Sequence, residues 1–202
     1  MNTPLAYFEG QYARSRDPWQ LADRWYDQRK YAITAAALPR ARYERAFEPG
    51  CSVGELTCLL AERCARLLAA DTVTSATSTA RQRTAHLPHV TVEQLSVPRQ
   101  WPEEPFDLIV LSEILYYFDE PSLQLLQERC VNSLTPGGHL VSVHWNHPVP
   151  EHLRTGREIA DRLQGQSGLS PLARYDDPDF TLTVHEHGTG PAASPAEGEG
   201  LV

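Results

Sequence analysis

Between residues 44 and 145, short apolar runs alternate with segments that carry apolar residues at helical spacing. The apolar runs predict strands at residues 45–48, 66–70, 90–94, 107–111 and 139–144. Helices are predicted at residues 55–64, 75–84 and 121–134, and the last of these has Leu123, Leu126, Cys130 and Leu134 on one face. Strands that alternate with helices in this way are typical of a mostly parallel sheet covered on both faces. We therefore predict an α/β fold of the Rossmann-like, doubly wound kind.

Three flanking segments complete the predicted architecture. Residues 1–43 are rich in aromatic and charged side chains, and we expect them to form a helical lid over the main domain. A helix at 154–164 and strands at 172–175 and 180–185 bring the sheet to seven strands, in a domain that spans residues 44–187. Thr-Pro-Gly-Gly at 135–138 predicts a turn that ends the preceding helix. The tail, 188–202, is rich in Pro, Gly, Ala and Glu and is predicted to be disordered.

The composition narrows the class of protein. A chain of 202 residues, 41% of them hydrophobic, fits one α/β domain. A net charge of −8, without runs of Lys or Arg, argues against a nucleic acid as partner. The four cysteines form no C-x-x-C pair, so no metal site is expected. We see neither a leader peptide nor an apolar run of transmembrane length, which predicts a cytoplasmic protein that binds no membrane.

The most informative stretch is the loop after the first predicted strand. Dinucleotide-binding folds use G-x-G-x-x-G there, so that a pyrophosphate can lie on the helix N-terminus. Here Gly50, Ser52 and Gly54 give G-x-S-x-G instead, and the next residue, Glu55, would repel a pyrophosphate. Glu48, at the end of the strand, suits a cation. S-adenosylmethionine (SAM) carries an ammonium and a sulfonium but no phosphate, and we expect it to be the ligand of this loop.

Asp71 supports the same ligand. It follows the second apolar run about twenty residues beyond the glycine turn, where a carboxylate can accept the hydrogen bonds of both ribose hydroxyls. At the end of the third strand, many SAM-binding enzymes carry an acidic residue that contacts the adenine amino group. Here Ser96 or Gln94 takes that place. The residues predicted to contact the cofactor from these loops are Glu48, Gly50, Cys51, Ser52, Gly54, Asp71, Thr72, Leu95, Ser96, Val97 and Ser112.

The candidates for chemistry lie at the ends of the fourth and fifth strands. Glu113 follows the fourth strand and could position or deprotonate an acceptor, although it equally suits the start of a helix. His144 ends the fifth strand and is the alternative base, or a structural histidine. Tyr116, Tyr117 and Trp145 are candidate walls of the acceptor site, where at least one tyrosine could instead belong to the core.

Five stretches together resemble one family, the nodulation protein S family of SAM-dependent methyltransferases. They are DPW at 17–19, WYDQRK at 25–30, EPGCSVGELT at 48–57, FDLIVLSEILYYF at 106–118 and LTPGGHLVSVHW at 134–145. The resemblance implies a Rossmann-like core, SAM as methyl donor, S-adenosylhomocysteine as product and no metal. It also implies that the N-terminal segment closes over the ligands, with Trp19 and Arg29 near the methionine end of SAM. An arginine there would pair with the SAM carboxylate.

The family's namesake N-methylates the free amine of a deacetylated chitooligosaccharide. We therefore expect this chain to methylate a small molecule, with the amine of an amino sugar or oligosaccharide as first candidate. O-methylation of a natural product is the alternative, and a non-catalytic SAM-binding subunit is a third. A nicotinamide dehydrogenase shares the fold, but the 50–52–54 spacing opposes it. After Trp145 the resemblance ends, so the acceptor and the oligomeric state stay open.

Overall fold

The computed structural model describes residues 2–202. Its seven strands form one sheet in the order β3-β2-β1-β4-β5-β7-β6. The strands are β1 (Ala46–Pro49), β2 (Leu67–Asp71), β3 (Val90–Gln94), β4 (Phe106–Ser112), β5 (Leu134–Trp145), β6 (Leu169–Asp176) and β7 (Phe180–His187). The helices are α1 (Leu5–Arg14), α2 (Trp25–Ala36), α3 (Glu55–Ala61), α4 (Thr74–Arg83), η1 (Leu115–Tyr117), α5 (Glu120–Ser133), α6 (Gly156–Gln164) and α7 (Pro195–Gly198).

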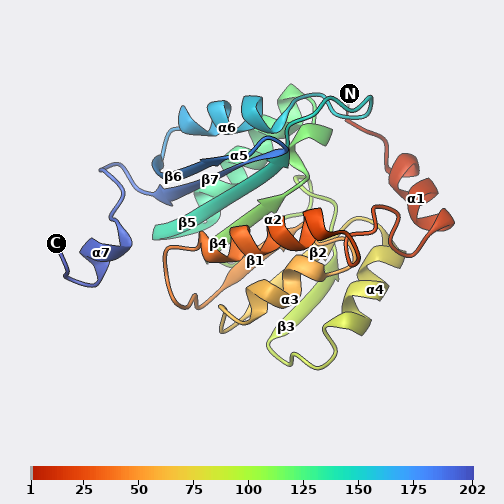
Figure 1. The fold of residues 1–202 in the computed structure, drawn as a ribbon, viewed down its shortest axis with the longest axis horizontal. Helices are drawn as coiled ribbons and strands as arrows, with labels where there is room; N and C mark the ends of the chain where they lie inside the picture. Colours follow the sequence, from red (N-terminus) through yellow and green to blue (C-terminus); the bar gives the residue numbers. More distant parts are fainter. Residues whose placement is uncertain (1) are drawn as a thin grey trace.

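The sheet is mostly parallel, which confirms the predicted Rossmann-like, doubly wound class. The pairs β1–β2, β2–β3, β1–β4 and β4–β5 are parallel, whereas β7 runs antiparallel to both of its neighbours, β5 and β6. Figure 1 shows α2 and α3 in front of the strands, and α6 beside β6 and β7 at the other edge from α4 and β3. Every predicted strand is present. The bounds of β1 to β4 lie within one residue of the prediction, β7 ends two residues later, and β6 and β5 begin three and five residues earlier.

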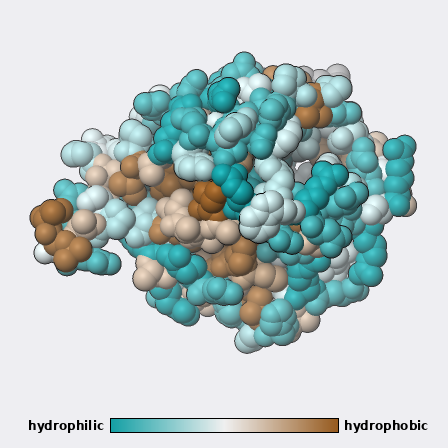
Figure 2. Space-filling model, viewed as in Figure 1, coloured by the Kyte–Doolittle hydropathy of each residue, from teal (hydrophilic) through white to brown (hydrophobic). Residues whose placement is uncertain are grey.

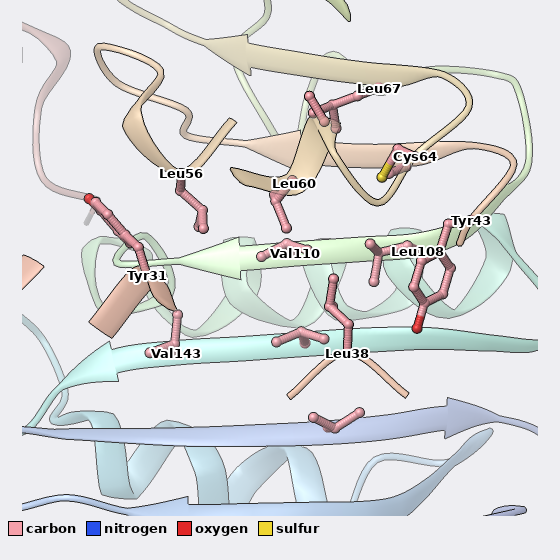
Figure 3. Close-up of a cluster of buried hydrophobic side chains, with 14 of the residues drawn as sticks. Tyr31, Leu38, Tyr43, Leu56, Leu60, Cys64, Leu67, Leu108, Val110 and Val143 are labelled. Atoms are coloured by element: carbon pink, nitrogen blue, oxygen red, sulfur yellow. The ribbon is translucent and has the colours of Figure 1, made fainter. Parts of the chain in front are cut away.

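The two faces of the sheet are covered by separate apolar layers. Leu108 and Val110 on β4 point to the layer formed by α2 and α3, shown in Figure 3, where they lie with Leu60. The residues that alternate with them, Ile109 and Leu111, pack with the helices of the opposite face. This double burial explains why β4 is a continuous apolar run rather than an alternating one.

Two local predictions differ from the structure. The Thr-Pro-Gly-Gly segment is not a separate turn but the first part of β5, where Leu134 pairs with Phe106 and His139 pairs with Leu108. Gly137, at φ +73°, accommodates the extra residues of this bulge. The tail predicted to be disordered contains α7, one turn capped by Ser194 and Glu197. The apolar residues at the left of Figure 2 lie at the same end of the chain, where Leu201 and Val202 are 70% and 87% exposed.

The N-terminal segment has two parts with different surroundings. Helix α2 belongs to the core, because Tyr31 and Leu38 join the layer over β4 and α3. Helix α1 instead packs through Tyr12 against the loops that follow β1 and β2. Before α1, the Thr3 backbone N–H donates to the carbonyl of Tyr117 at 2.9 Å. Of the two, this first part is the one that packs on loops at the ends of the strands, where we expect a lid. Within residues 2–202, no helix is both long and apolar enough to cross a membrane.

Three histidines in the sheet link the stability of the fold to pH. His139, His144 and His185 are 1–2% exposed, and burial lowers their pKa values to about 4, about 3 and about 4. Each stays neutral in the folded state while the unfolded chain takes up a proton below about pH 6.5. Their contribution to stability is therefore present above about pH 6.5 and is lost as the pH falls toward 4.

We predict that the free energy of unfolding drops between pH 7 and pH 5 by about 1–2 kcal/mol for each of these histidines. Urea unfolding followed by circular dichroism measures it. His185→Gln should flatten the pH dependence, whereas the same change at the exposed His86 should leave it unaltered. A pH dependence that is the same in wild type and His185→Gln would contradict the assignment.

Candidate functional site

A cavity of about 820 Å³ lies at the carboxyl edge of the sheet, under α1 and beside α2. The ends of β1, β2 and β4 and the segment after β5 all contribute side chains to it. Its volume is in the range of small-molecule and cofactor sites. The edge is also where the fold places ligands, at the point where neighbouring strands β1 and β4 connect in opposite directions.

The loop between β1 and α3 presents its backbone to the cavity. Gly50 has φ +79° and Ser52 has φ +51°, both in the left-handed region. A Cβ on Gly50 would lie 2.2 Å from the Cγ2 of Ile114, so only glycine fits there. The predicted residues Gly50, Cys51 and Ser52 line the cavity. Gly54, at φ +84°, does not: it allows close packing against Ala80 and shapes the loop from outside.

Asp71 ties the two ligand loops together. Its carboxylate accepts the backbone N–H of Ser52 at 3.0 Å and that of Val73 at 2.9 Å. A carboxylate has about four acceptor positions, so Asp71 can still accept from a hydroxyl group in the cavity. Burial raises the pKa of Asp71, although these backbone hydrogen bonds oppose the shift. From the lid, the Tyr12 hydroxyl meets the Ser52 hydroxyl at 2.5 Å, which connects α1 to the same loop.

Glu48 lies at the end of β1 and also faces the cavity, at 2% exposure. Its carboxylate accepts a hydrogen bond from the Thr57 hydroxyl at 2.6 Å. Burial raises the pKa of Glu48 to about 8, and the nearby charge of Asp71 adds to this effect. Within residues 2–202 its one hydrogen-bond donor is a neutral hydroxyl, so a cationic ligand would stabilise the ionised form of Glu48 and lower this pKa.

The loop after β3 supplies Leu95, Ser96 and Val97 to the cavity. Of the two residues that could contact adenine, Ser96 lines the cavity and Gln94 does not. The Gln94 side chain instead forms hydrogen bonds with the carbonyl of Thr72 and the hydroxyl of Thr74. The Ser96 hydroxyl accepts a hydrogen bond from the Thr72 hydroxyl at 3.1 Å. Thr72 and Ser112, both predicted, line the cavity as well.

Glu113 lies in the cavity but is not a free base. It has φ +59°, and its carboxylate accepts hydrogen bonds from Lys30 at 2.8 Å, from the backbone N–H of Trp145 at 3.1 Å and from the Tyr116 hydroxyl. Burial alone would raise the pKa of Glu113, but the charge of Lys30 and these hydrogen bonds hold it below its usual range. The group is therefore an anchored carboxylate, suited to orient a ligand rather than to remove a proton.

His144 is not placed to act as a base, and of its two predicted roles the structural one fits its surroundings. It is 1% exposed and is not among the residues that line the cavity. Its Nε2 accepts the backbone N–H of Leu115 at 3.0 Å, so the proton of the neutral ring is on Nδ1, 3.0 Å from the Ser142 hydroxyl. With both nitrogens used and a pKa lowered to about 3 by burial, His144 is a structural residue.

Arg29 also lies away from its predicted place. Its guanidinium pairs with Asp177 at 2.6 Å and donates to the Tyr175 hydroxyl at 3.0 Å, outside the cavity lining. Trp19, by contrast, lines the cavity beside Tyr12, with ring centroids 5.4 Å apart. The cations that do line the cavity are Arg24, Lys30 and Arg99.

The three residues predicted to form the walls of the acceptor site all line the cavity. Tyr116, Tyr117 and Trp145 face the cavity together, and Tyr116 and Tyr117 meet edge to face at 4.7 Å. Tyr26 closes against Trp145 at 5.0 Å, and Phe8 from the lid meets Tyr117 at 4.9 Å. This end of the cavity is therefore walled by aromatic rings.

Lys30 is the most informative residue that sequence reasoning missed. It is the only lysine of the chain and is 2% exposed. Its ammonium lies 3.0 Å from Asp27 and 2.8 Å from Glu113, and 4.9 Å from the centre of the Tyr26 ring. Two signals in the sequence include Lys30: the WYDQRK stretch at 25–30, and the i, i+3 spacing of Asp27 and Lys30, which is also common on solvated helices. Tyr12 and His152, two further lining residues, belong to no motif.

Comparison with known proteins agrees with this geometry. A family model described as Nodulation protein S (NodS) matches residues 10–144. The chain belongs to the nodulation protein S family. Nodulation protein S of Rhizobium tropici is 34% identical over 127 residues, which are 62% of this chain and 53% of that protein. The chain thus spans about half the length of this curated relative.

Two further similarities concern fold and chemistry. The crystal structure of the N-methyltransferase NodS from Bradyrhizobium japonicum WM9 in complex with S-adenosyl-L-homocysteine is 26% identical, with a TM-score of 0.83, and covers 94% of this chain and 100% of that chain. Trans-aconitate 2-methyltransferase of Methylobacterium nodulans is 36% identical over 135 residues, 65% of this chain and 50% of that protein. The fold is that of the class I methyltransferases in both layers and strand order.

We predict that Gly50→Ala abolishes or strongly weakens binding of S-adenosylhomocysteine, because the new methyl group meets Ile114 and the residue must keep a left-handed φ. Isothermal titration calorimetry measures the affinity. Gly188→Ala, at a position with open space around the added atom, is the matched control and should bind normally. Equal affinities in the two variants would show that the loop tolerates a side chain at Gly50.

We also predict that Lys30→Met destabilises the fold by about 3–5 kcal/mol, because it leaves two carboxylates buried without their shared cation. The double variant Lys30→Met/Glu113→Gln should recover part of this loss, since one of the two charges is gone. Arg45→Met removes a surface pair with Glu104 and should cost less than about 1 kcal/mol. Urea unfolding midpoints compare the three, and a Lys30→Met midpoint equal to that of Arg45→Met would refute the prediction.

Proposed function

We propose that this chain transfers a methyl group from SAM to the amine of a small-molecule acceptor. The observation that carries the proposal is the cluster of Asp27, Lys30 and Glu113 at the aromatic end of a cavity whose other end has the loops of a SAM site. Both ends open into the same space, so donor and acceptor can meet there.

The residues of the cofactor end fit SAM in three respects. Asp71 keeps acceptor positions for ribose hydroxyls, Glu48 offers a buried carboxylate to a cation, and Gly50 leaves room for the ligand at the main chain. When bound, SAM supplies a methyl group that its sulfonium makes electrophilic. The protein's part is to hold the acceptor nitrogen in line with that methyl group and to exclude water.

The charge at the acceptor end favours an amine over a carboxylate. Two carboxylates and one ammonium, in Asp27, Glu113 and Lys30, leave a net charge of −1 next to electron-rich rings. A protonated amine is attracted to such a place, as the ammonium of Lys30 over the Tyr26 ring illustrates. A carboxylate acceptor, as the name of the relative trans-aconitate 2-methyltransferase indicates for that protein, would be repelled.

Amino sugars and oligosaccharides are the acceptors that we place first. The similarity to the N-methyltransferase NodS supports an amine as acceptor, and aromatic walls such as Tyr117 and Trp145 suit a sugar ring as well as a cation. The lid supports a reaction shielded from water, because Thr3 and Tyr12 hold α1 across the cavity. O-methylation of a natural product and a non-catalytic SAM-binding role are the alternatives. We propose no nucleic acid as partner.

A screen with isotope-labelled SAM, read by mass spectrometry, tests the proposal. We predict label in deacetylated amino sugars and oligosaccharides. The same sugars with an N-acetyl group are the matched controls and should remain unlabelled, because their amide nitrogen is not nucleophilic. A tricarboxylate such as trans-aconitate should also remain unlabelled. Label on sugar hydroxyls or on the carboxylate would favour O-methylation, and SAM binding without label in any acceptor would favour the non-catalytic role.

A further inference from the structure

His152 is the one titratable side chain in the acceptor end whose ring nitrogens have no partner within residues 2–202. Its Nδ1 is buried without a hydrogen bond, and the ring lines the cavity. It lies in the segment after β5, beyond the stretch matched by the family model, residues 10–144. Neither the family match nor any sequence motif therefore assigns it a role.

The ring is held in a defined position. It stacks on Tyr116, with centroids 3.6 Å apart and planes at 15°, and meets Tyr117 edge to face at 5.0 Å. The backbone around it is fixed too, because Leu153 N–H donates to the carbonyl of Tyr116 at 2.8 Å. On the far side, the Thr3 hydroxyl donates to the carbonyl of Glu151 at 2.9 Å. Such a ring is oriented by packing, while its nitrogens make no hydrogen bond to residues 2–202.

The other candidates for proton transfer are engaged elsewhere. Glu113 is an ion pair with Lys30, and both nitrogens of His144 bond within the core. The tyrosine hydroxyls of this end have pKa values raised by burial, so they are poor proton acceptors at neutral pH. Burial lowers the pKa of His152, which keeps the ring neutral and able to accept a proton.

We propose that His152 is the base that removes a proton from the acceptor amine. This rests on the proposed function. An amine that enters as an ammonium ion cannot attack until one N–H bond breaks. The electron pair of that bond stays on nitrogen as the nucleophilic lone pair, and the proton joins a ring nitrogen of His152 to give an imidazolium. The proton leaves to solvent when the product departs.

Two carboxylates near His152 stabilise that imidazolium and oppose the effect of burial. The charged and titratable groups that face His152 come from several elements. They are Glu113 after β4, Tyr116 and Tyr117 in η1, His144 on β5 and Glu151, the neighbour of His152 in the chain. Both Glu113 and Glu151 favour the protonated ring, whereas His144 stays neutral. Tyr116 connects the stacked ring to Glu113 through its hydroxyl, so the new charge lies next to an anchored carboxylate.

His152→Phe tests the base, because it keeps the ring stack on Tyr116 and removes the nitrogens. With an amino-sugar acceptor at pH 7, kcat/KM should fall about 10²-fold or more, while affinity for S-adenosylhomocysteine stays within a few-fold. The deficit should shrink at pH 9.5, where the amine arrives already neutral. His152→Ala should regain activity when imidazole is added. His86→Phe, on the exposed surface, is the control and should behave as wild type.

The outcomes separate this proposal from the proposed function. If wild type labels no amine, the proposed function fails and the base fails with it. If wild type labels the amine and His152→Phe does so within about threefold at every pH, only the base is overturned. A loss in His152→Phe that is equal at pH 7 and pH 9.5 and does not respond to imidazole in His152→Ala would assign His152 to packing alone, which also overturns the proposal.

Discussion

The structure depends on one constraint of its sheet. Strands β1 and β4 are parallel neighbours, but the chain leaves β1 toward the face covered by α3 and leaves β4 toward the face covered by α5. The two connections separate at the carboxyl edge and leave space between them. The glycine loop, Asp71 and Glu113 all lie there because Asp71 ends a strand at this edge and the other two directly follow one. The strand order therefore creates the space of the ligand site, and the side chains then determine what it binds.

Lys30 connects that edge to the N-terminal segment. Without a cation between them, the carboxylates of Asp27 and Glu113 would repel each other and would remain poorly solvated. The ammonium from α2 neutralises one charge and fixes the position of Glu113, whose left-handed backbone would otherwise be costly for a residue with a Cβ. The same contact joins a helix of the core layer to the acceptor end of the cavity. Stability and ligand recognition thus share one buried ion pair.

The sequence predicts the layers and the cofactor loops well, because they depend on local patterns. Apolar runs locate the strands, and the positions of Gly50, Ser52 and Asp71 in order along the chain indicate the ligand. Contacts between distant segments are not visible in this way. Arg29 and Lys30 are adjacent and equally basic in sequence, yet one pairs with Asp177 at the sheet and the other is buried in the cavity. Nothing local distinguishes His144 from His152 either, because the partners that decide their roles come from η1 and the lid.

Lys30 also allows the opening of the cavity wall to be measured by chemical modification. Since it is the only lysine side chain in the chain, an amine-directed reagent can modify lysine at one position alone. That position is reached only when the Lys30 side chain separates from Asp27 and Glu113 enough to admit the reagent, because the side chain is 2% exposed in the closed arrangement. The rate of acylation at Lys30 therefore reports how often the cavity wall opens. The measurement needs no attached fluorophore and no introduced cysteine.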